Sequence, residues 1–300
     1  MFSRMFLKRM FSAAHKPKVE CVFHEDTNTC CYIVSCSQTG QAAVIDSVLD
    51  YDSVNHKSST THADKVISKI KSHHWNLSHI LETHVHADHL TGAQVLKKAF
   101  PNAKSVIGAN VVKVQETFAK ALNLKSISLK GAEFDILLHD EDKLHIGSME
   151  LRALATPGHT PACMVYIIGD AIFTGDTIFM PDFGTARCDF PGGSADQLYD
   201  SIKRIFELPE TSRVFVGHDY GTEARKPAWE TTVFAEKHHN KQMNMKTTKE
   251  EFVAWRKGRD AKLSLPKLIM QSLQVNLRNG QLPEPESNGV VYFKLPLNLL

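Results

Sequence analysis

Short runs rich in β-branched residues alternate along this chain with longer segments whose apolar side chains recur at helical spacing. The runs 21–25, 30–36 and 42–48 are separated by turn-forming segments, which predicts a β-meander. Residues 61–73 carry apolar side chains on one helical face and lysines opposite, which predicts a helix. Residues 77–81 predict a short apolar strand, and that strand runs directly into a turn dense in histidine.

The same two patterns continue toward the carboxyl end. The expected helices cover residues 90–100, 111–122 and 195–208. The expected strands are 105–110, several between 124 and 155, 164–168, 171–174 and 213–216. The tail from residue 221 is lysine-rich and is expected to be partly helical. Strands followed by helices in two successive halves indicate two sheets with helices outside them.

The histidine-rich turn reads THVHADH and contains four potential metal ligands, namely His84, His86, Asp88 and His89. Imidazoles and a carboxylate gathered in one turn are costly to bury unless a cation or hydrogen bonds satisfy them. The turn also follows the carboxyl end of a predicted strand, where ligand sites collect in α/β sheets. We therefore expect a metal site here, and we expect Asp88 to cap the helix that follows.

Three more candidate ligands each follow a glycine at a predicted strand end. His159 follows Gly158, Asp176 follows Gly175, and His218 follows Gly217. Glycine lets the backbone turn sharply and brings the next side chain close to a shared centre. Seven candidate ligands result: His84, His86, Asp88, His89, His159, Asp176 and His218. Asp46, at the end of the third strand, either lies near the histidine turn or caps its own strand.

Composition narrows the choice of function. The chain has 300 residues, of which 42% are hydrophobic and 23% charged, as in ordinary globular proteins. The formal net charge of +2 argues against a general nucleic-acid binder. Residues 1–19 hold five basic residues and no acid, so taking them away leaves a net charge of −3.

This basic segment, 1–19, is amphipathic if helical, which is typical of a mitochondrial presequence; a disordered basic tail is the alternative. A presequence would be removed after import and take no part in the fold. It has no apolar run long enough for a secretory signal or a transmembrane helix, so no membrane association is expected.

The six cysteines include no C-x-x-C pair. In a chain that is not secreted, this spacing indicates free thiols rather than a disulfide framework. Cys30 and Cys31 are adjacent in a predicted strand, so their side chains should point to opposite faces of a sheet. We expect both to be small buried apolar side chains.

The intact H-x-H-x-D-H turn and its three glycine-preceded partners resemble the metallo-β-lactamase superfamily over residues 20–220. The resemblance implies an αββα sandwich, with two mixed β-sheets, helices on both outer faces, and metals between the sheets at one edge. It implies a catalytic domain over 20–220 and a C-terminal extension, 221–300, packed on the same domain. It implies one metal held by His84, His86, His159 and bridging Asp176, and another held by Asp88, His89, His218 and Asp176.

Two branches of the superfamily fit most closely. The segments HADHLTGA, ATPGHTPAC, FTGD, TARCDF, LYDSI and GHDY, together with the tail's LPKL and QVNLRNG, are similar to persulfide dioxygenases. Hydroxyacylglutathione hydrolase (glyoxalase II) shares all seven ligands, but it usually continues the turn as xDHxGG, where this chain has DHLTG. The long tail also departs from short animal-type dioxygenases and looks more like a longer bacterial branch.

The two branches imply different chemistry. A hydrolase would use two metals such as zinc, a bridging hydroxide and a polarised thioester. A dioxygenase would use one iron(II) held by two histidines and a carboxylate, which the resemblance assigns to His84, His159 and Asp176. Glutathione persulfide and O2 would be the substrates, and sulfite and glutathione the products. The remaining four candidates would then orient those ligands and bind water.

Three further residues are candidate substrate contacts. Arg187 matches an arginine near the dioxygenase site, where its fork could hold a glutathione carboxylate; a surface salt bridge is the alternative. Tyr220, beside His218, could hydrogen-bond the substrate or a metal-bound histidine, or be a half-buried core tyrosine. Arg278 could close over the thiol substrate. Asp88 and Tyr220 are the candidate catalytic side chains.

We therefore expect a mononuclear iron persulfide dioxygenase of the mitochondrial matrix that acts in sulfide disposal. The alternative is a dinuclear thioester hydrolase of the glyoxalase II type. A metal-binding scaffold without catalysis is disfavoured because no ligand is substituted. A homodimer is a candidate assembly, and no nucleic-acid partner is expected.

Overall fold

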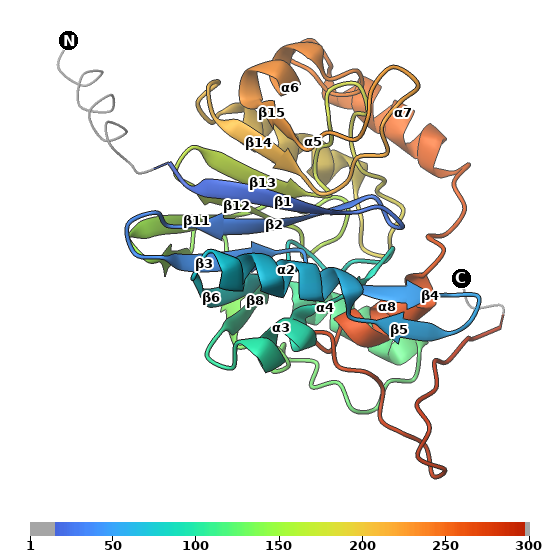
Figure 1. Cartoon of the computed structure of the whole chain (residues 1–300). Coiled ribbons are helices and arrows are strands. Elements are labelled where there is room, and N and C mark those ends of the chain that lie inside the picture. Colours follow the sequence, from blue (N-terminus) through green and yellow to red (C-terminus); the bar gives the residue numbers. More distant parts are fainter. Residues whose placement is uncertain (1–15, 298–300) are drawn as a thin grey trace.

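Two six-stranded sheets pack face to face in the computed structural model, which describes residues 16–297 (Figure 1). Residues 1–15, which make up most of the expected presequence, lie outside the described residues. The expected boundary at residue 19 is wrong, because Lys18 and Val19 pair with β2 (Thr29–Ser35) as part of strand β1 (Lys18–His24). Within residues 16–297, no helix is long and apolar enough to cross a membrane.

The first sheet has the strand order β1-β2-β3-β6-β8-β9. Its strands are β1 (Lys18–His24), β2 (Thr29–Ser35), β3 (Gln41–Ile45), β6 (Asn76–Leu81), β8 (Lys104–Gly108) and β9 (Ile136–Leu138). β1, β2 and β3 form the expected antiparallel meander, and β6, β8 and β9 then continue in parallel. The sheet is therefore mixed.

The second sheet has the order β10-β11-β12-β13-β14-β15. Its strands are β10 (Lys143–Ile146), β11 (Met149–Ala155), β12 (Met164–Ile168), β13 (Ala171–Gly175), β14 (Arg213–Val216) and β15 (Glu230–Thr232). All neighbours are antiparallel except β13 and β14, which run in parallel. This single parallel pair matters for the site, because both strands end at the same edge.

Helices cover both outer faces, so the expected αββα sandwich is confirmed (Figure 1). The first sheet is covered by α2 (Thr61–Ser72), α3 (Ala93–Ala99), α4 (Val111–Ala121) and α8 (Ile269–Asn276). The second is covered by α5 (Ala195–Phe206), α6 (Val233–His239) and α7 (Lys249–Asp260). Apolar faces on these helices drive the packing, as Val66, Ile67 and Ile70 of α2 illustrate.

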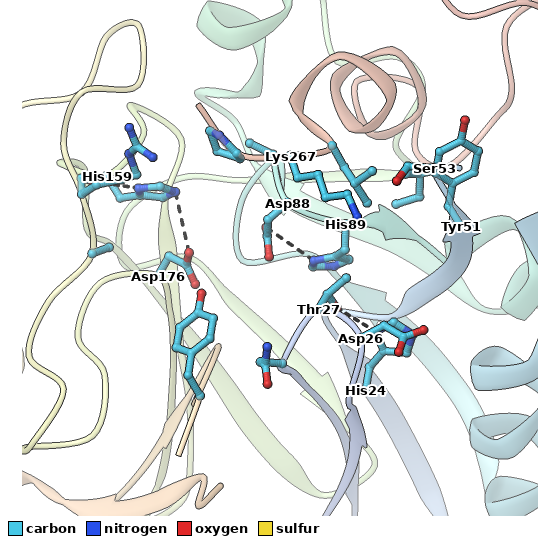
Figure 2. Close-up of a pocket in the computed structure, with 18 of the residues that line it drawn as sticks. His24, Asp26, Thr27, Tyr51, Ser53, Asp88, His89, His159, Asp176 and Lys267 are labelled. Carbon is cyan, nitrogen blue, oxygen red and sulfur yellow. Dashed lines mark hydrogen bonds and ion pairs between the residues drawn. The ribbon is translucent and has the colours of Figure 1, made fainter. Parts of the chain in front are cut away.

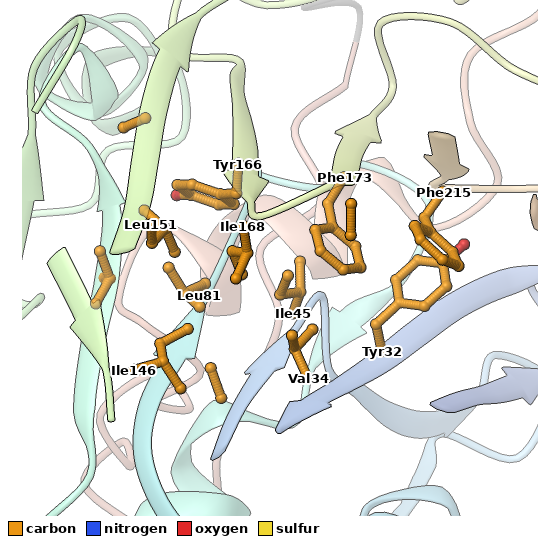
Figure 3. Close-up of a cluster of buried hydrophobic side chains, with 14 of the residues drawn as sticks. Tyr32, Val34, Ile45, Leu81, Ile146, Leu151, Tyr166, Ile168, Phe173 and Phe215 are labelled. Atoms are coloured by element: carbon orange, nitrogen blue, oxygen red, sulfur yellow. The ribbon is translucent and has the colours of Figure 1, made fainter. Parts of the chain in front are cut away.

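The core between the sheets is built from alternate residues of the strands (Figure 3). Tyr32 and Val34 of β2 point into this core, whereas Ile33 points to the helices on the outer face. Cys30 and Cys31 divide in the same way, as expected, and both are fully buried. Burying a large apolar side chain such as that of Val34 or Ile33 contributes about 1.5–3 kcal/mol to the free energy of folding.

One local prediction was wrong. Leu90 and Thr91 do not open a helix but form strand β7, which pairs with β4 (Val48–Asp52) in a small third sheet completed by β5 (Lys57–Ser59). Helix α3 begins at Ala93 with Gly92 as its N-cap, so Asp88 does not cap it. A two-residue strand is too short to leave a periodic pattern, and only pairing with β4 reveals it.

We predict that Glu236 makes the protein's stability fall as pH rises. Its carboxyl is fully buried on α6 and accepts one hydrogen bond from Asn240 Nδ2, at 2.8 Å, and burial raises its pKa from 4.5 to about 8. The folded state therefore retains a proton that the unfolded state loses between pH 4.5 and 8. In the wild type this lowers the free energy of unfolding by about 1.4 kcal/mol per pH unit within that window, and Glu236→Gln should remove this pH dependence.

Urea unfolding of the wild type and Glu236→Gln at several pH values between 5 and 8 measures this difference. The exposed Glu223→Gln is the matched control and should follow the wild type at every pH. A constant gap between Glu236→Gln and the wild type across the window would contradict the assignment.

Candidate metal centre

The strand directions of the second sheet bring three of the candidate ligands to one edge. β11, β13 and β14 all run the same way, because β12 is antiparallel to both β11 and β13 while β14 is parallel to β13. His159 lies in the loop after β11, Asp176 directly after β13, and His218 directly after β14. Their loops therefore meet at the carboxyl ends of these strands.

The histidine turn reaches the same edge from the first sheet, where it follows β6. Two hydrogen bonds connect the start of the turn to the second sheet. Met164 N donates to the Thr83 carbonyl at 2.9 Å, and the Tyr166 hydroxyl donates to the Glu82 carbonyl at 2.8 Å. Gly175 has a φ of +46°, and a Cβ there would lie 2.3 Å from Thr83 Oγ1. A glycine is therefore required for the two sheets to approach at this point.

All seven expected ligands converge in two adjoining clusters. His84, His159 and Asp176 form one, and His86, Asp88, His89 and His218 form the other, with candidate ligand atoms within 4.8 Å of one another in each. Asp176 joins the clusters, because one of its oxygens lies 3.8 Å from His159 Nε2 and the other 3.4 Å from His218 Nε2. The His86 ring contacts a ring of each cluster, because its centroid lies 4.1 Å from that of His84 and 4.2 Å from that of His89.

Each site histidine is oriented through one ring nitrogen. His159 Nδ1 donates to the Arg187 carbonyl at 2.7 Å, and His218 Nδ1 donates to the Asn28 carbonyl at 3.2 Å. A carbonyl accepts only, so Nδ1 carries the proton in the neutral form of both rings, and Nε2 then faces the centre with its lone pair. His86 is held from the other side, since its Nε2 lies 3.0 Å from Asp46 Oδ1 and 3.3 Å from Glu82 Oε2.

The atoms that face the centre are buried and have no hydrogen-bond partner among the described residues. They are His84 Nε2, His86 Nδ1, His89 Nε2 and Asp176 Oδ1. Leaving a buried polar atom unpaired costs about 1–3 kcal/mol, so four at one point call for a ligand. Imidazole nitrogens with their second nitrogen hydrogen-bonded are the arrangement in which proteins present histidine to metals. The residues therefore fit a metal ion.

The charges of the cluster suit a cation as well. Burial holds the pKa of His84 well below its usual range and lowers that of His89 to about 4, so both imidazoles are neutral near pH 7. Burial would raise the pKa of Asp88, but the charge of protonated His218 outweighs burial and holds that pKa well below its usual range. Burial lowers the pKa of His218, but Asp176 and Asp88 outweigh burial and raise it, so a metal ion would displace a proton there. Neutral imidazole and ionised carboxylate are the forms that bind metals.

A cavity of about 1140 Å³ opens onto this centre (Figure 2). His159 and Asp176 lie on one side of it, and Tyr51 and Ser53 of the β4–β5 hairpin lie on the other. Four basic residues of the lining have no ion pair within residues 16–297: Lys57, Lys241, Arg259 and Lys267. These four side chains can pair with negative charge on a bound small molecule, in a lining that also holds five aspartates.

The three expected substrate contacts fare differently. Arg187 lines the cavity, but its fork is bound to both oxygens of Asp189 at 2.5 Å, and its Nη1 donates to the Ser264 carbonyl. Tyr220 also lines the cavity, is half exposed, and stacks on Phe183 with ring centroids 5.0 Å apart. Arg278 is buried outside the cavity lining, so the structure does not bring it to the site.

Three side chains of the site were left open or missed by the sequence. Asp46 lies beside the turn and accepts from Thr83 N at 2.7 Å as well as from His86, which settles the choice left open above. Glu82 is fully buried and accepts from Thr91 Oγ1 at 2.5 Å, and Asn276 donates to the turn from α8. A lone acid in a strand and an asparagine 190 residues away leave no local signal.

An αββα sandwich with adjoining histidine and carboxylate clusters at one open edge defines a metal-binding protein. The sequence model of the protein family described as "Metallo-beta-lactamase superfamily" matches residues 25–218. The chain therefore belongs to this superfamily, in its persulfide dioxygenase and glyoxalase II-like branch. It is an enzyme of the hydrolase or dioxygenase type with a metal cofactor.

Two relatives and one solved structure illustrate this similarity. A Dictyostelium discoideum protein named Glyoxylase B2 is 46% identical and is covered over 99% of its length by 96% of this chain. The mitochondrial persulfide dioxygenase of Mus musculus is 31% identical, over 66% of this chain and 67% of its own length. The crystal structure of ETHE1 from Myxococcus xanthus superimposes with a TM-score of 0.71 at 29% identity, covering 88% of this chain and all of that one.

Because Asp176 is shared by both clusters, we predict that Asp176→Asn lowers the metal content of the purified protein at least about tenfold, as loss of a ligand should do at minimum. Elemental analysis after dialysis measures this. Asp200→Asn, which removes an exposed carboxylate paired with Lys249, is the control and should keep wild-type metal content.

Chelation should also lower the melting temperature of the wild type, because a metal that binds only the folded state stabilises it. It should leave the melting temperature of Asp176→Asn unchanged. Equal metal content in the wild type and Asp176→Asn would exclude this residue as a ligand.

Proposed function

We propose that this protein is an iron(II)-dependent persulfide dioxygenase that oxidises glutathione persulfide with O2 to sulfite and glutathione. The observation that carries the proposal is the cluster of His84, His159 and Asp176, which gathers two imidazoles and one carboxylate beside the second cluster. This ligand set on one face of the ion, with open positions opposite, is typical of non-haem iron(II) oxygenases. One iron per chain is the proposed cofactor.

The proposed reaction balances with water as co-reactant. Glutathione persulfide, O2 and water give glutathione, sulfite and two protons. The S–S bond breaks, the outer sulfur gains three oxygens, and the four electrons it loses reduce O2. Iron(II) would supply the redox-active centre that brings O2 and the persulfide sulfur together.

The chain's own residues orient the ligands and the substrate. The Arg187 carbonyl holds the His159 ring, and Thr83 Oγ1, 3.0 Å from His84 Nδ1, holds the His84 ring. Asp88 lines the cavity with a side chain that is 31% exposed, so its carboxylate can accept a hydrogen bond from a substrate or water there. Tyr220 is the proposed hydrogen-bond donor toward bound substrate.

Substrate recognition would use the basic side chains of the cavity that have no ion pair in the described part of the chain. Glutathione carries two carboxylates, and Lys241, Arg259 and Lys267 are cavity residues without an ion pair in the described part of the chain. Arg187 would contribute less directly, since Asp189 already occupies its fork. The similarity to the mouse persulfide dioxygenase and to the Myxococcus xanthus structure supports the same substrate class.

A second candidate is a dinuclear thioester hydrolase of the glyoxalase II type. The specific observation in its favour is the second cluster, His86, Asp88, His89 and His218, which retains a complete set of possible ligands. The name of the Dictyostelium discoideum relative points the same way. A hydrolase would need two metals, zinc for example, and no oxygen.

We expect the protein, purified without added metal, to contain about one iron per chain and to consume O2 when given glutathione persulfide. Sulfite should accumulate in step with the O2 consumed. Elemental analysis, an oxygen electrode and sulfite detection on one sample measure all three. About two zinc ions per chain, with hydrolysis of S-lactoylglutathione and no O2 uptake, would establish the hydrolase instead.

Two variants distinguish the dioxygenase from the hydrolase further. For the dioxygenase, His159→Ala should lose iron and activity by at least about tenfold, whereas His218→Ala should keep most of its iron. For the hydrolase, each variant should lose one of two metals and most of the activity.

We further propose that the part of residues 1–19 that precedes β1 directs the protein to the mitochondrial matrix, on the basis of its basic, acid-free and amphipathic composition. Fused to a fluorescent reporter, residues 1–19 should carry it into mitochondria. Replacing Arg4, Lys8 and Arg9 together by glutamine should leave the reporter in the cytosol. A reporter that stays in the cytosol when it carries the natural segment would contradict mitochondrial targeting.

A further inference from the structure

Asn276, the last residue of α8, contacts the histidine turn although 190 residues separate it from His86. Its side chain is 4% exposed. Nδ2 donates to the carbonyls of His86 and His89, both at 2.8 Å, and Oδ1 accepts from Thr91 N at 2.9 Å. Both amide hydrogens and the amide oxygen are thus used on one short stretch of backbone.

The stretch that Asn276 holds is the part of the turn that lacks regular structure. Between β6 and β7 the backbone forms no helix or strand, so neighbouring strands do not fix the direction of its peptide groups. The two carbonyls it binds belong to His86 and His89, and these residues bracket Asp88. Fixing the carbonyls at both ends of a four-residue segment fixes the directions in which its side chains leave the backbone.

Packing determines where Asn276 itself lies. Leu268 and Val275 of the C-terminal segment form an apolar cluster with Leu90, directly after the turn. Gln94 of α3 donates to the Asn279 carbonyl at 2.7 Å, beside Asn276 in the chain. In Figure 1, α8 lies next to β4 and β5, at the edge where the turn ends. The amide is therefore presented to the turn by a rigid support.

We propose that Asn276 is a positioning residue for the metal centre: it sets the geometry of the His86–Asp88–His89 cluster through the backbone of the turn. The C-terminal extension then takes part in metal binding although none of its residues is among the candidate ligands. This inference goes beyond the proposed function, because it applies to a hydrolase and to a dioxygenase alike. It concerns the cluster around His86 and His89 more directly than the cluster around His84.

The chain offers a closely matched control for this proposal. Asn279 lies three residues further on and is 1% exposed, and its Nδ2 also makes two bonds, to Ser105 Oγ and the Glu133 carbonyl, both at 2.9 Å. Changing either asparagine to aspartate keeps the shape, removes two donors and adds a negative charge. Only Asn276→Asp places that change against the histidine turn.

The experiment compares the full-length wild type, Asn276→Asp and Asn279→Asp after loading with cobalt(II), whose visible absorption reports its ligands. We expect Asn276→Asp to lose cobalt to excess EDTA more than about tenfold faster than the wild type, and its visible spectrum to change. Asn279→Asp should keep the wild-type spectrum and lose cobalt within about twofold of the wild-type rate. Melting temperatures without metal show how far each variant is destabilised in general.

Two results would overturn the proposal: wild-type cobalt loss and spectrum in Asn276→Asp, or equally fast loss in both variants. If Asn276→Asp does not fold, Asn276→Ala takes its place, because it removes the amide without adding charge. The same acceleration and spectral change are then required of it. Since cobalt binding is measured without any substrate, the result is independent of which reaction the protein catalyses.

Discussion

Burying five imidazoles and their carboxylates at one edge is the constraint on which the functional end of this molecule depends. Each histidine must satisfy one ring nitrogen within the fold and leave the other for a cation. His159 and His218 do so through the carbonyls of Arg187 and Asn28, which lie far from them in the sequence. The arrangement is stable only if strands from both sheets deliver those partners together, since an unpaired buried polar atom costs about 1–3 kcal/mol.

The same constraint explains why one fold can carry either of two chemistries. Asp176 reaches both clusters, and the His86 ring lies about midway between those of His84 and His89. Small changes in the surroundings of these rings can therefore favour one ion or two without changing the ligand list. The buried pair of Asp46 and Glu82 behind His86 belongs to those surroundings, as does the amide of Asn276 in front of it.

Local patterns predicted most of the elements and all seven ligands of the two adjoining clusters. The period of apolar residues located α2, α4 and α5, and β-branched runs between turns located the meander. Where local patterns misled, a distant partner was responsible: Leu90 and Thr91 became a strand because β4 lies beside them, and Asp88 consequently lost its expected role as a cap. Arg278 looked available to a substrate but is buried away from the cavity.

The sequence by itself determined the ligand types and their attachment to strand ends, because the spacing of histidine, aspartate and glycine is a local property of the chain. Only the tertiary structure decided which ligands share a cluster, which nitrogen of each ring faces the centre, and that Glu82 and Asn276 support the turn. These facts depend on hydrogen bonds between residues as much as 190 positions apart, and no local pattern encodes such contacts. Strand order and direction bring those residues together, so the geometry of the site is a property of the whole sandwich.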